Sequence, residues 1–173
     1  MTVITESKME FGPFSEEKLF YIEKSKIFKS LGNGVKTVEF ILKYNKNNIF
    51  FVEAKESCPN AANRSESEEK EYKFEEYYSS ITEKFIDSLQ IILASTFDRF
   101  DDVSEIGGEL QTDFRNKDTH VKFVLVIKKI NDIKWLVGPC EELRARLIKF
   151  RKIWNVDIIV MNEDMAREKK LIV

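Results

Sequence analysis

The chain has 173 residues, of which 43% are hydrophobic and 12% aromatic, with 14 Phe. This length suits one domain spanning residues 1–173, and the apolar content is sufficient for a core, which excludes global disorder. Lys and Arg (28) nearly balance Asp and Glu (30), so the net charge of −2 excludes a histone-like polycation. No apolar run predicts a membrane span, and residues 1–14 lack the apolar segment of a signal peptide.

Cysteine and histidine usage narrows the chemistry further. Cys58 and Cys140 are the only cysteines, which is too few for a disulfide scaffold and fits a reducing, cytoplasmic location. His120 is the only histidine, which excludes His-rich zinc sites. Any metal site must therefore use carboxylates, which prefer hard cations such as Mg²⁺ or Mn²⁺.

The first predicted element lies in residues 15–31, and its type stays open. Ser15 followed by two glutamates is typical of a helix start, whereas the apolar run 19–22 suits a buried strand. The Gly-Asn-Gly sequence at 32–34 then breaks the chain.

Residues 35–44 and 49–55 are rich in β-branched and aromatic side chains and predict two strands. An Asn-rich turn joins them, so they form a hairpin. Residues 49–52 are apolar on both faces, which indicates a central strand.

The rest of the chain alternates between helices and strands. The pattern predicts a loop over 58–68, a helix over 69–95, a loop over 98–119, a strand over 121–128, a helix over 139–152, a strand over 156–161 and a helix over 163–170. The crossover from 121–128 to 156–161 is long enough for a parallel pair. The predicted fold class is therefore α/β, with a mixed central sheet of about four strands flanked by helices. Trp135 and Trp154 are expected to anchor the core at strand ends, with base stacking as the alternative.

Three charged residues stand out in the predicted hairpin. The pattern Glu-x-Lys occurs six times in the chain, but only Glu53-Ala54-Lys55 follows a fully apolar run. Side chains alternate along a strand, so Glu53 and Lys55 share a face and lie roughly 6.6 Å apart along it. Glu39 is also embedded in apolar sequence, on the other strand. Charges in such positions are costly unless they are paired.

The pairing register decides whether the two acids meet. If paired residue numbers sum to 92, Glu39 faces Glu53 with β-carbons about 5 Å apart, and a three-residue loop closes the hairpin. Two such carboxylates repel unless one is protonated or a divalent cation lies between them. A sum of 93 would place them on opposite faces. The alternative to a metal site is a structural ion pair with Lys55.

An acid on one strand, Glu-x-Lys at the end of the next and a long helix afterwards resemble the PD-(D/E)xK nuclease superfamily. The best match runs from Val35 to Ser57, VKTVEFILKYNKNNIFFVEAKES. The resemblance implies a restriction-endonuclease-like αβββαβ core and a metal-dependent nuclease, with DNA the expected substrate and defence or restriction the expected setting. The chain departs from the family pattern because it lacks a Pro-Asp dipeptide and carries Glu39 in place of the usual Asp.

The resemblance also implies roles for individual residues. Glu39, Glu53 and the carbonyl of Ala54 would bind Mg²⁺ or Mn²⁺, and Lys55 would orient the attacking water and stabilise charge on the phosphate. An acid of the first element would complete the site; Glu23 is the candidate, with Glu16 and Glu17 as rivals. A homodimer that cuts both strands is also compatible with the family.

Three basic residues are candidates for binding nucleic acid. Lys84 lies at the edge of the apolar stripe of the long helix, and Arg144 and Arg151 belong to a basic segment within 139–152. The alternative is that all three belong to ordinary solvated helix faces.

Two other functions stay open. The chain is either a nuclease-like fold without activity that binds nucleic acid or protein, or a structural domain whose hairpin carries an ion pair. Binding of Mn²⁺ separates the enzyme from both.

Overall fold

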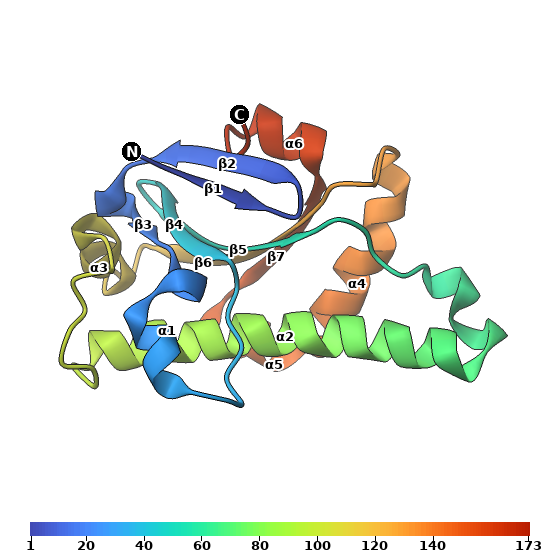
Figure 1. Cartoon of the computed structure of the whole chain (residues 1–173), viewed down its shortest axis with the longest axis horizontal. Coiled ribbons are helices and arrows are strands. Elements are labelled where there is room, and N and C mark those ends of the chain that lie inside the picture. Colours follow the sequence, from blue (N-terminus) through green and yellow to red (C-terminus); the bar gives the residue numbers. More distant parts are fainter.

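The computed structural model describes residues 1–173 as an α/β protein built around a five-stranded sheet (Figure 1). The strands lie in the order β3 (Leu19–Phe20), β4 (Phe40–Asn45), β5 (Asn48–Lys55), β6 (His120–Ile127) and β7 (Asp157–Asn162). The first three are antiparallel, and β5, β6 and β7 are parallel. The predicted mixed sheet is therefore confirmed, with five strands in place of about four because the two residues of β3 add an edge strand.

Helices and a separate hairpin surround this sheet. The hairpin consists of β1 (Thr2–Glu6) and β2 (Met9–Phe14), and the helices are α1 (Lys26–Leu31), α2 (Glu68–Thr96), α3 (Gly108–Phe114), α4 (Val137–Arg146), α5 (Ile148–Trp154) and α6 (Glu163–Glu168). Short 3-10 helices occur at η1 (Glu16–Lys18), η2 (Ile22–Lys24), η3 (Ala61–Glu66) and η4 (Ile133–Leu136). No helix combines the length and apolar character needed to cross a membrane.

The two faces of the sheet carry different layers (Figure 1). Odd-numbered residues of β5, such as Phe51, belong to a core shared with α2 and α4, and even-numbered residues such as Val52 belong to a core shared with the hairpin and α6. The apolar stripe of α2 packs on the first face as its spacing predicts, and Phe85 stacks on Phe123 of β6 with centroids 4.7 Å apart. Glu53 and Lys55 therefore project toward α2.

The β1–β2 hairpin is absent from the sequence-based prediction. Its strands have only short apolar alternation, and its turn is formed by Ser7 and Lys8 with φ of 48° and 62°, a conformation usually taken by Asn or Gly. The chain terminus holds the hairpin in place, because Ile172 bridges to Phe11 and the N–H of Val173 donates to the carbonyl of Glu10 at 3.1 Å. The pairing with the chain terminus leaves no local signal, so only the short alternation within the hairpin was available to predict it.

Other predicted boundaries also need correction. Residues 15–31 contain both alternatives, since strand β3 is followed by helix α1. The predicted loop over 98–119 contains helix α3, and the predicted helix over 139–152 is two helices that meet at Leu147. Leu147, between the two helices, is fully buried and belongs to the core.

Both tryptophans lie outside the core, contrary to the prediction. Trp135 is 60% exposed and Trp154 is 48% exposed. Trp135 lies within η4 and Trp154 is the last residue of α5, so neither is at the strand end that was predicted.

Candidate active site

The Glu-x-Lys segment lies at the end of the central strand β5. Glu53 is completely buried, and the Lys55 ammonium contacts Glu53 Oε1 at 2.6 Å while remaining partly exposed. Their shared face is the one that the alternation of side chains predicts. The strand pairs with β6 along its whole length and with β4 as far as Val52, so Glu53 lies just past the β4 ladder and is held by its pairing with Leu125 of β6.

Glu39 approaches Glu53 from the neighbouring strand. Phe40 pairs with Val52, Ile41 with Phe51 and Lys43 with Ile49, which confirms the register in which paired numbers sum to 92. Glu39 itself precedes β4, and its N–H donates to the carbonyl of Val52 at 3.0 Å. The expected three-residue loop is instead a two-residue turn, because an irregularity between Lys43 and Asn45 shifts the register at the tip.

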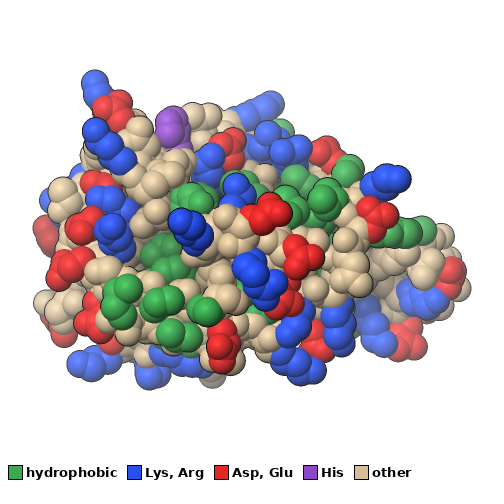
Figure 2. Space-filling model, turned by 90° about the horizontal axis from the view of Figure 1, so that it is seen from above, with side chains coloured by type: hydrophobic (Ala, Val, Ile, Leu, Met, Phe, Trp, Pro, Cys, Tyr) green, Lys and Arg blue, Asp and Glu red, His purple; other side chains and the backbone are tan.

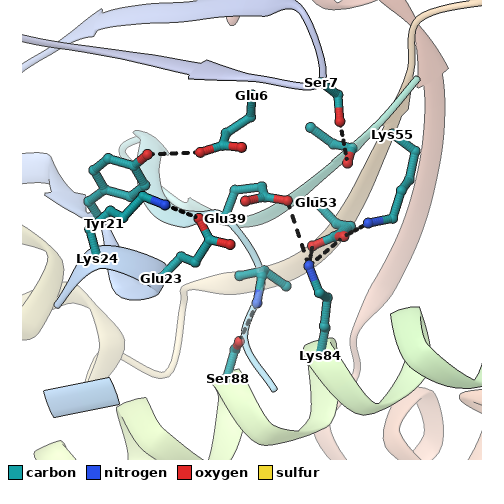
Figure 3. Close-up of polar contacts among 12 residues, drawn as sticks. Glu6, Ser7, Tyr21, Glu23, Lys24, Glu39, Glu53, Lys55, Lys84 and Ser88 are labelled. Atoms are coloured by element: carbon teal, nitrogen blue, oxygen red, sulfur yellow. Dashed lines mark hydrogen bonds and ion pairs between the residues drawn. The ribbon is translucent and has the colours of Figure 1, made fainter. Parts of the chain in front are cut away.

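Lys84 of α2 lies between these two carboxylates (Figure 3). Its ammonium donates to Oε1 and Oε2 of Glu53 at 2.8 and 3.0 Å and lies 3.6 Å from Glu39 Oε1. Burial alone would lower the pKa of Lys84, but its interactions with Glu53 and Glu39 outweigh burial and raise that pKa. A lysine therefore occupies the place between Glu39 and Glu53 at which the sequence analysis expected a divalent cation.

A cluster of three carboxylates lies on the other side of Glu39. Oxygens of Glu6, Glu23 and Glu39 lie within 4.8 Å of one another. The last residue of β1 supplies Glu6 and η2 supplies Glu23, whose N–H donates to the carbonyl of Glu39 at 3.4 Å. Tyr21 donates its hydroxyl to Glu6 at 2.9 Å, and Lys24 lies 3.1 Å from Glu23. We call Glu6, Glu23 and Glu39 the acid cluster.

Glu39 is the electrostatically unbalanced member of the acid cluster. It is 4% exposed, and its Oε2 has no hydrogen-bond partner. Figure 3 shows one of its oxygens toward Lys84 and the other on the side of Glu6 and Glu23. Burial and the negative charge of Glu53 raise the pKa of Glu39 to about 8, with Lys84 opposing the shift. This carboxyl therefore holds a proton near neutral pH unless a cation replaces it.

The turn of the β1–β2 hairpin contacts the Glu-x-Lys segment directly. Ser7 donates its hydroxyl to the carbonyl of Ala54 at 3.0 Å (Figure 3), and Lys8 donates to Glu56 at 3.0 Å. A carbonyl oxygen has two lone pairs, so the Ala54 carbonyl can still accept a second bond. The hairpin that sequence analysis missed thus supplies Glu6, Ser7 and Lys8 to this region.

The structure brings together only some of the predicted site residues. Glu23, Glu39, Glu53, Ala54, Lys55 and Lys84 lie at one place. Glu16 contacts the N-terminal ammonium at 3.9 Å, and neither it nor Glu17 joins the acid cluster. Arg144 pairs with Glu141 of its own helix at 2.9 Å, and Arg151 has a buried Nε without a partner. Neither arginine contacts the acid cluster or Glu53.

Positive charge is not concentrated on the face seen from above the β1–β2 hairpin. Figure 2 shows Lys and Arg side chains interspersed there with Asp and Glu, in agreement with a net charge of −2. Attraction of an anionic ligand would therefore depend on small local groups of lysines rather than on one broad basic surface.

Glu6 and Ser7 are the residues of this site that sequence reasoning missed. Glu6 and Lys8 form one of the six Glu-x-Lys tripeptides, set aside because its surroundings are polar. The usable signal was the alternation of Ile4, Met9 and Phe11, all buried in the structure, on either side of Ser7-Lys8. Comparison of the chain with protein-family models, curated proteins and solved structures gave no match. The geometry of the site is thus the basis on which a function is inferred.

Proposed function

We propose that the protein is a metal-dependent nuclease that hydrolyses phosphodiester bonds, with DNA as the expected substrate. The observation that carries the proposal is the buried, unpartnered Oε2 of Glu39 within the acid cluster, next to Glu53 and Lys55. An acidic cluster alone is common in proteins. A carboxylate oxygen buried there without a partner is costly and calls for a ligand.

The donor set fits a hard cation. The acid cluster offers three carboxylate oxygens within 4.8 Å of one another. Such ligands suit Mg²⁺ or Mn²⁺ rather than a metal that prefers thiolate ligands. The proposal therefore assigns the cation to Glu6, Glu23 and Glu39, and it assigns Glu53 to holding the two lysines. When bound, such an ion lowers the pKa of a coordinated water and neutralises charge on the phosphate.

The chain's own residues have separate tasks in this proposal. Lys55 is the more exposed of the two lysines that hold Glu53, so its ammonium is placed to contact a phosphate oxygen from the solvent side. Lys84, deeper in the site, pairs with Glu53 and orients it. Ser7 fixes the Ala54 carbonyl and with it the end of β5.

The order of elements also supports the proposal. Strands β3, β4 and β5 form an antiparallel meander, α2 follows, and β6 returns parallel to β5. This order is compatible with the βββαβ portion of the restriction-endonuclease-like core that the resemblance implies. Action as a homodimer stays a prediction of that resemblance.

Calorimetric titration with Mn²⁺ tests the metal site, and a cleavage assay on DNA and RNA tests the activity. We expect the wild type to bind Mn²⁺, Glu39→Gln to lose binding and Glu109→Gln, an exposed acid outside the cluster, to retain it. Lys55→Ala should bind Mn²⁺ but lose cleavage. Binding that is equal in wild type and Glu39→Gln contradicts the metal assignment, and undiminished cleavage by Lys55→Ala contradicts the proposed role of that lysine.

A second candidate is an inactive nuclease-like fold that binds nucleic acid or protein. It is favoured by Lys84, which already neutralises Glu53 and lies near Glu39 as a structural ion pair would. This candidate predicts no uptake of Mn²⁺ and no cleavage by the wild type, together with a folded protein.

A further inference from the structure

A cavity lies beyond the ends of β5 and β6, separate from the acid cluster. Its volume is about 600 Å³, which lies within the range of small-molecule pockets. Phe74 and Tyr78 line it from α2 and are almost fully buried, whereas Trp135 of η4 lines it and is 60% exposed. Pro59 and Pro139 add further apolar surface. The exposed indole of Trp135 offers a flat apolar surface, which favours a planar, unsaturated ligand.

Two lysines line this cavity, and two more lie next to one of them. Lys129 and Lys134 line it, and Lys134 forms no ion pair. Lys129 and Lys8 share the carboxylate of Glu56, and Lys128 donates its ammonium to the carbonyl of Lys8. We call Lys8, Lys128, Lys129 and Lys134 the lysine group.

Few acids offset the lysine group. Its two neighbouring acids are Glu56 and Asp132, and Asp132 caps η4 by accepting the N–H of Lys134 at 2.9 Å. The third acid at the cavity, Glu142, pairs with Arg146 at 2.6 Å. The lysine group therefore carries an excess of positive charge, which favours an anionic ligand.

The cavity is close to the candidate active site. The N–H groups of Lys128 and Lys129 donate to the carbonyls of Lys55 and Glu56 at 2.9 Å. The segments that follow β5 and β6 therefore leave the sheet side by side. Cys58, on the cavity wall, follows Lys55 by three residues, so their α-carbons are separated by no more than about 11 Å. A ligand in the cavity is thus a near neighbour of a phosphate held at Lys55.

We propose that this cavity binds one unpaired nucleotide of the substrate strand, with its base against Trp135 and its phosphate on the lysine group. Aromatic walls with lysines at one side match the two parts of a nucleotide, a flat base and an anionic phosphate. The proposal rests on the proposed function for the identity of the strand, because it places this nucleotide beside the bond to be cut. The cavity assignment adds a substrate class to that function, namely a single strand or the frayed end of a duplex.

The same geometry predicts a preference for unpaired strands. A base within a duplex must be unstacked and unpaired before it can enter the cavity, whereas an unpaired base enters without that cost. Stacking of one base on an aromatic side chain typically changes affinity by about 5- to 140-fold. Removal of the Trp135 indole should weaken single-strand binding within that range.

Tryptophan fluorescence tests the proposal without reference to catalysis. The chain has two tryptophans, so Trp154→Phe leaves Trp135 as the single reporter. In EDTA, thymidine 5′-monophosphate should quench Trp135 saturably, and thymidine or inorganic phosphate alone should bind more weakly. For a single-stranded oligonucleotide, Trp135→Ala should lower affinity about 5- to 140-fold, while Trp154→Ala, which alters an exposed tryptophan outside the cavity, should leave it unchanged. Trp135→Phe should restore most of the loss, and circular dichroism verifies that each variant is folded.

The outcomes separate this inference from the proposed function. Nucleotide binding without cleavage would support the cavity assignment and contradict the nuclease. Cleavage without Trp135 quenching, and with equal rates for wild type and Trp135→Ala, would overturn the cavity assignment and leave the nuclease standing. Self-association of the wild type that Trp135→Ala abolishes, with no nucleotide binding, would assign the exposed indole to a protein contact and would also overturn it.

Discussion

Folding moves the Glu39 carboxyl from water to a position that is 4% exposed, so the stability of the protein should depend on pH. Its pKa is raised to about 8 in the folded protein from an ordinary value of 4.5. Between these two values the folded state holds one more proton than the unfolded state. The free energy of unfolding must then fall as pH rises, and this contribution is fully present only below about pH 4.5.

The slope in this window is about 1.4 kcal/mol per pH unit. Between about pH 5 and pH 7.5 the wild type should therefore lose roughly 3 kcal/mol from Glu39 alone, a large fraction of a typical stability of about 5–15 kcal/mol. Glu39→Gln keeps the size of the side chain and resembles the protonated acid. The variant should lack this contribution to the pH dependence over the range and be the more stable protein at its upper end.

Urea unfolding at several pH values, without divalent cations, measures this difference. The other ionisable groups are common to both proteins, so their contributions cancel in the comparison. Profiles of wild type and Glu39→Gln that run parallel between about pH 5 and pH 7.5 would refute the reasoning. They would mean that water or structural relaxation neutralises the burial of this carboxyl.

Three further predictions concern the same region and its core. Lys84→Met should destabilise the protein by about 3 kcal/mol or more in urea unfolding, because Glu53 is completely buried and would keep only Lys55 as a partner. Lys84→Arg should recover part of the loss. A loss below about 1 kcal/mol in Lys84→Met would contradict the buried pairing. Mn²⁺ binding at the acid cluster should release a proton near neutral pH, and its affinity should rise up to about tenfold for each unit of pH increase below the pKa of Glu39. Calorimetry in two buffers of different ionisation enthalpy measures the number of protons released. A value of zero argues against Glu39 as a ligand. Phe85→Ala should cost about 3–5 kcal/mol in the same unfolding assay, since it removes a fully buried ring stacked on Phe123; a loss under about 1 kcal/mol would mean that the α2 contact with the sheet collapses to fill the space.

The sequence predicted those parts of the fold that depend on local pattern. The strands near 49–55, 121–128 and 156–161 have apolar, β-branched sequences and the long helix has a clear apolar stripe, and all four elements occur in the structure. The strand predicted over 35–44 is correct only in its second half, because β4 begins at Phe40. The sequence left two registers open for the hairpin of β4 and β5, with paired numbers summing to 92 or 93, and Phe40 opposite Val52 shows that the first is present.

The parts that failed depend on contacts between distant segments. The β1–β2 hairpin is held by the chain terminus through Phe11 and Ile172, about 160 residues apart in sequence. Helix α3 begins next to Gly107, where an added β-carbon would meet the backbone of Glu16 at 2.4 Å, so its position depends on close packing against another segment. No local window contains these relationships.

The candidate site shows the same division. Glu53, Lys55 and Glu39 were found because they are charges in or next to apolar sequence. Glu23 was found because it belongs to the element that precedes the hairpin of β4 and β5. Glu6 could not be found in this way, since its neighbours in sequence are polar and its relation to Glu39 exists only once the β1–β2 hairpin is placed. Lys84 was identified as a residue at the edge of the stripe, but its pairing with Glu53 required the three-dimensional distance.

The charges at this site are one cation short of balance, and this determines what it can do. Four carboxylates, those of Glu6, Glu23, Glu39 and Glu53, face three ammonium groups, of Lys24, Lys55 and Lys84. A proton on Glu39 restores balance, whereas a divalent cation that several carboxylates share exceeds the deficit by one positive charge. The proton stabilises the folded chain only below the pKa of Glu39, whereas a cation acts above it as well. The two therefore compete for one oxygen, and binding of Mn²⁺ should remove the pH dependence of stability that Glu39 creates in the free protein.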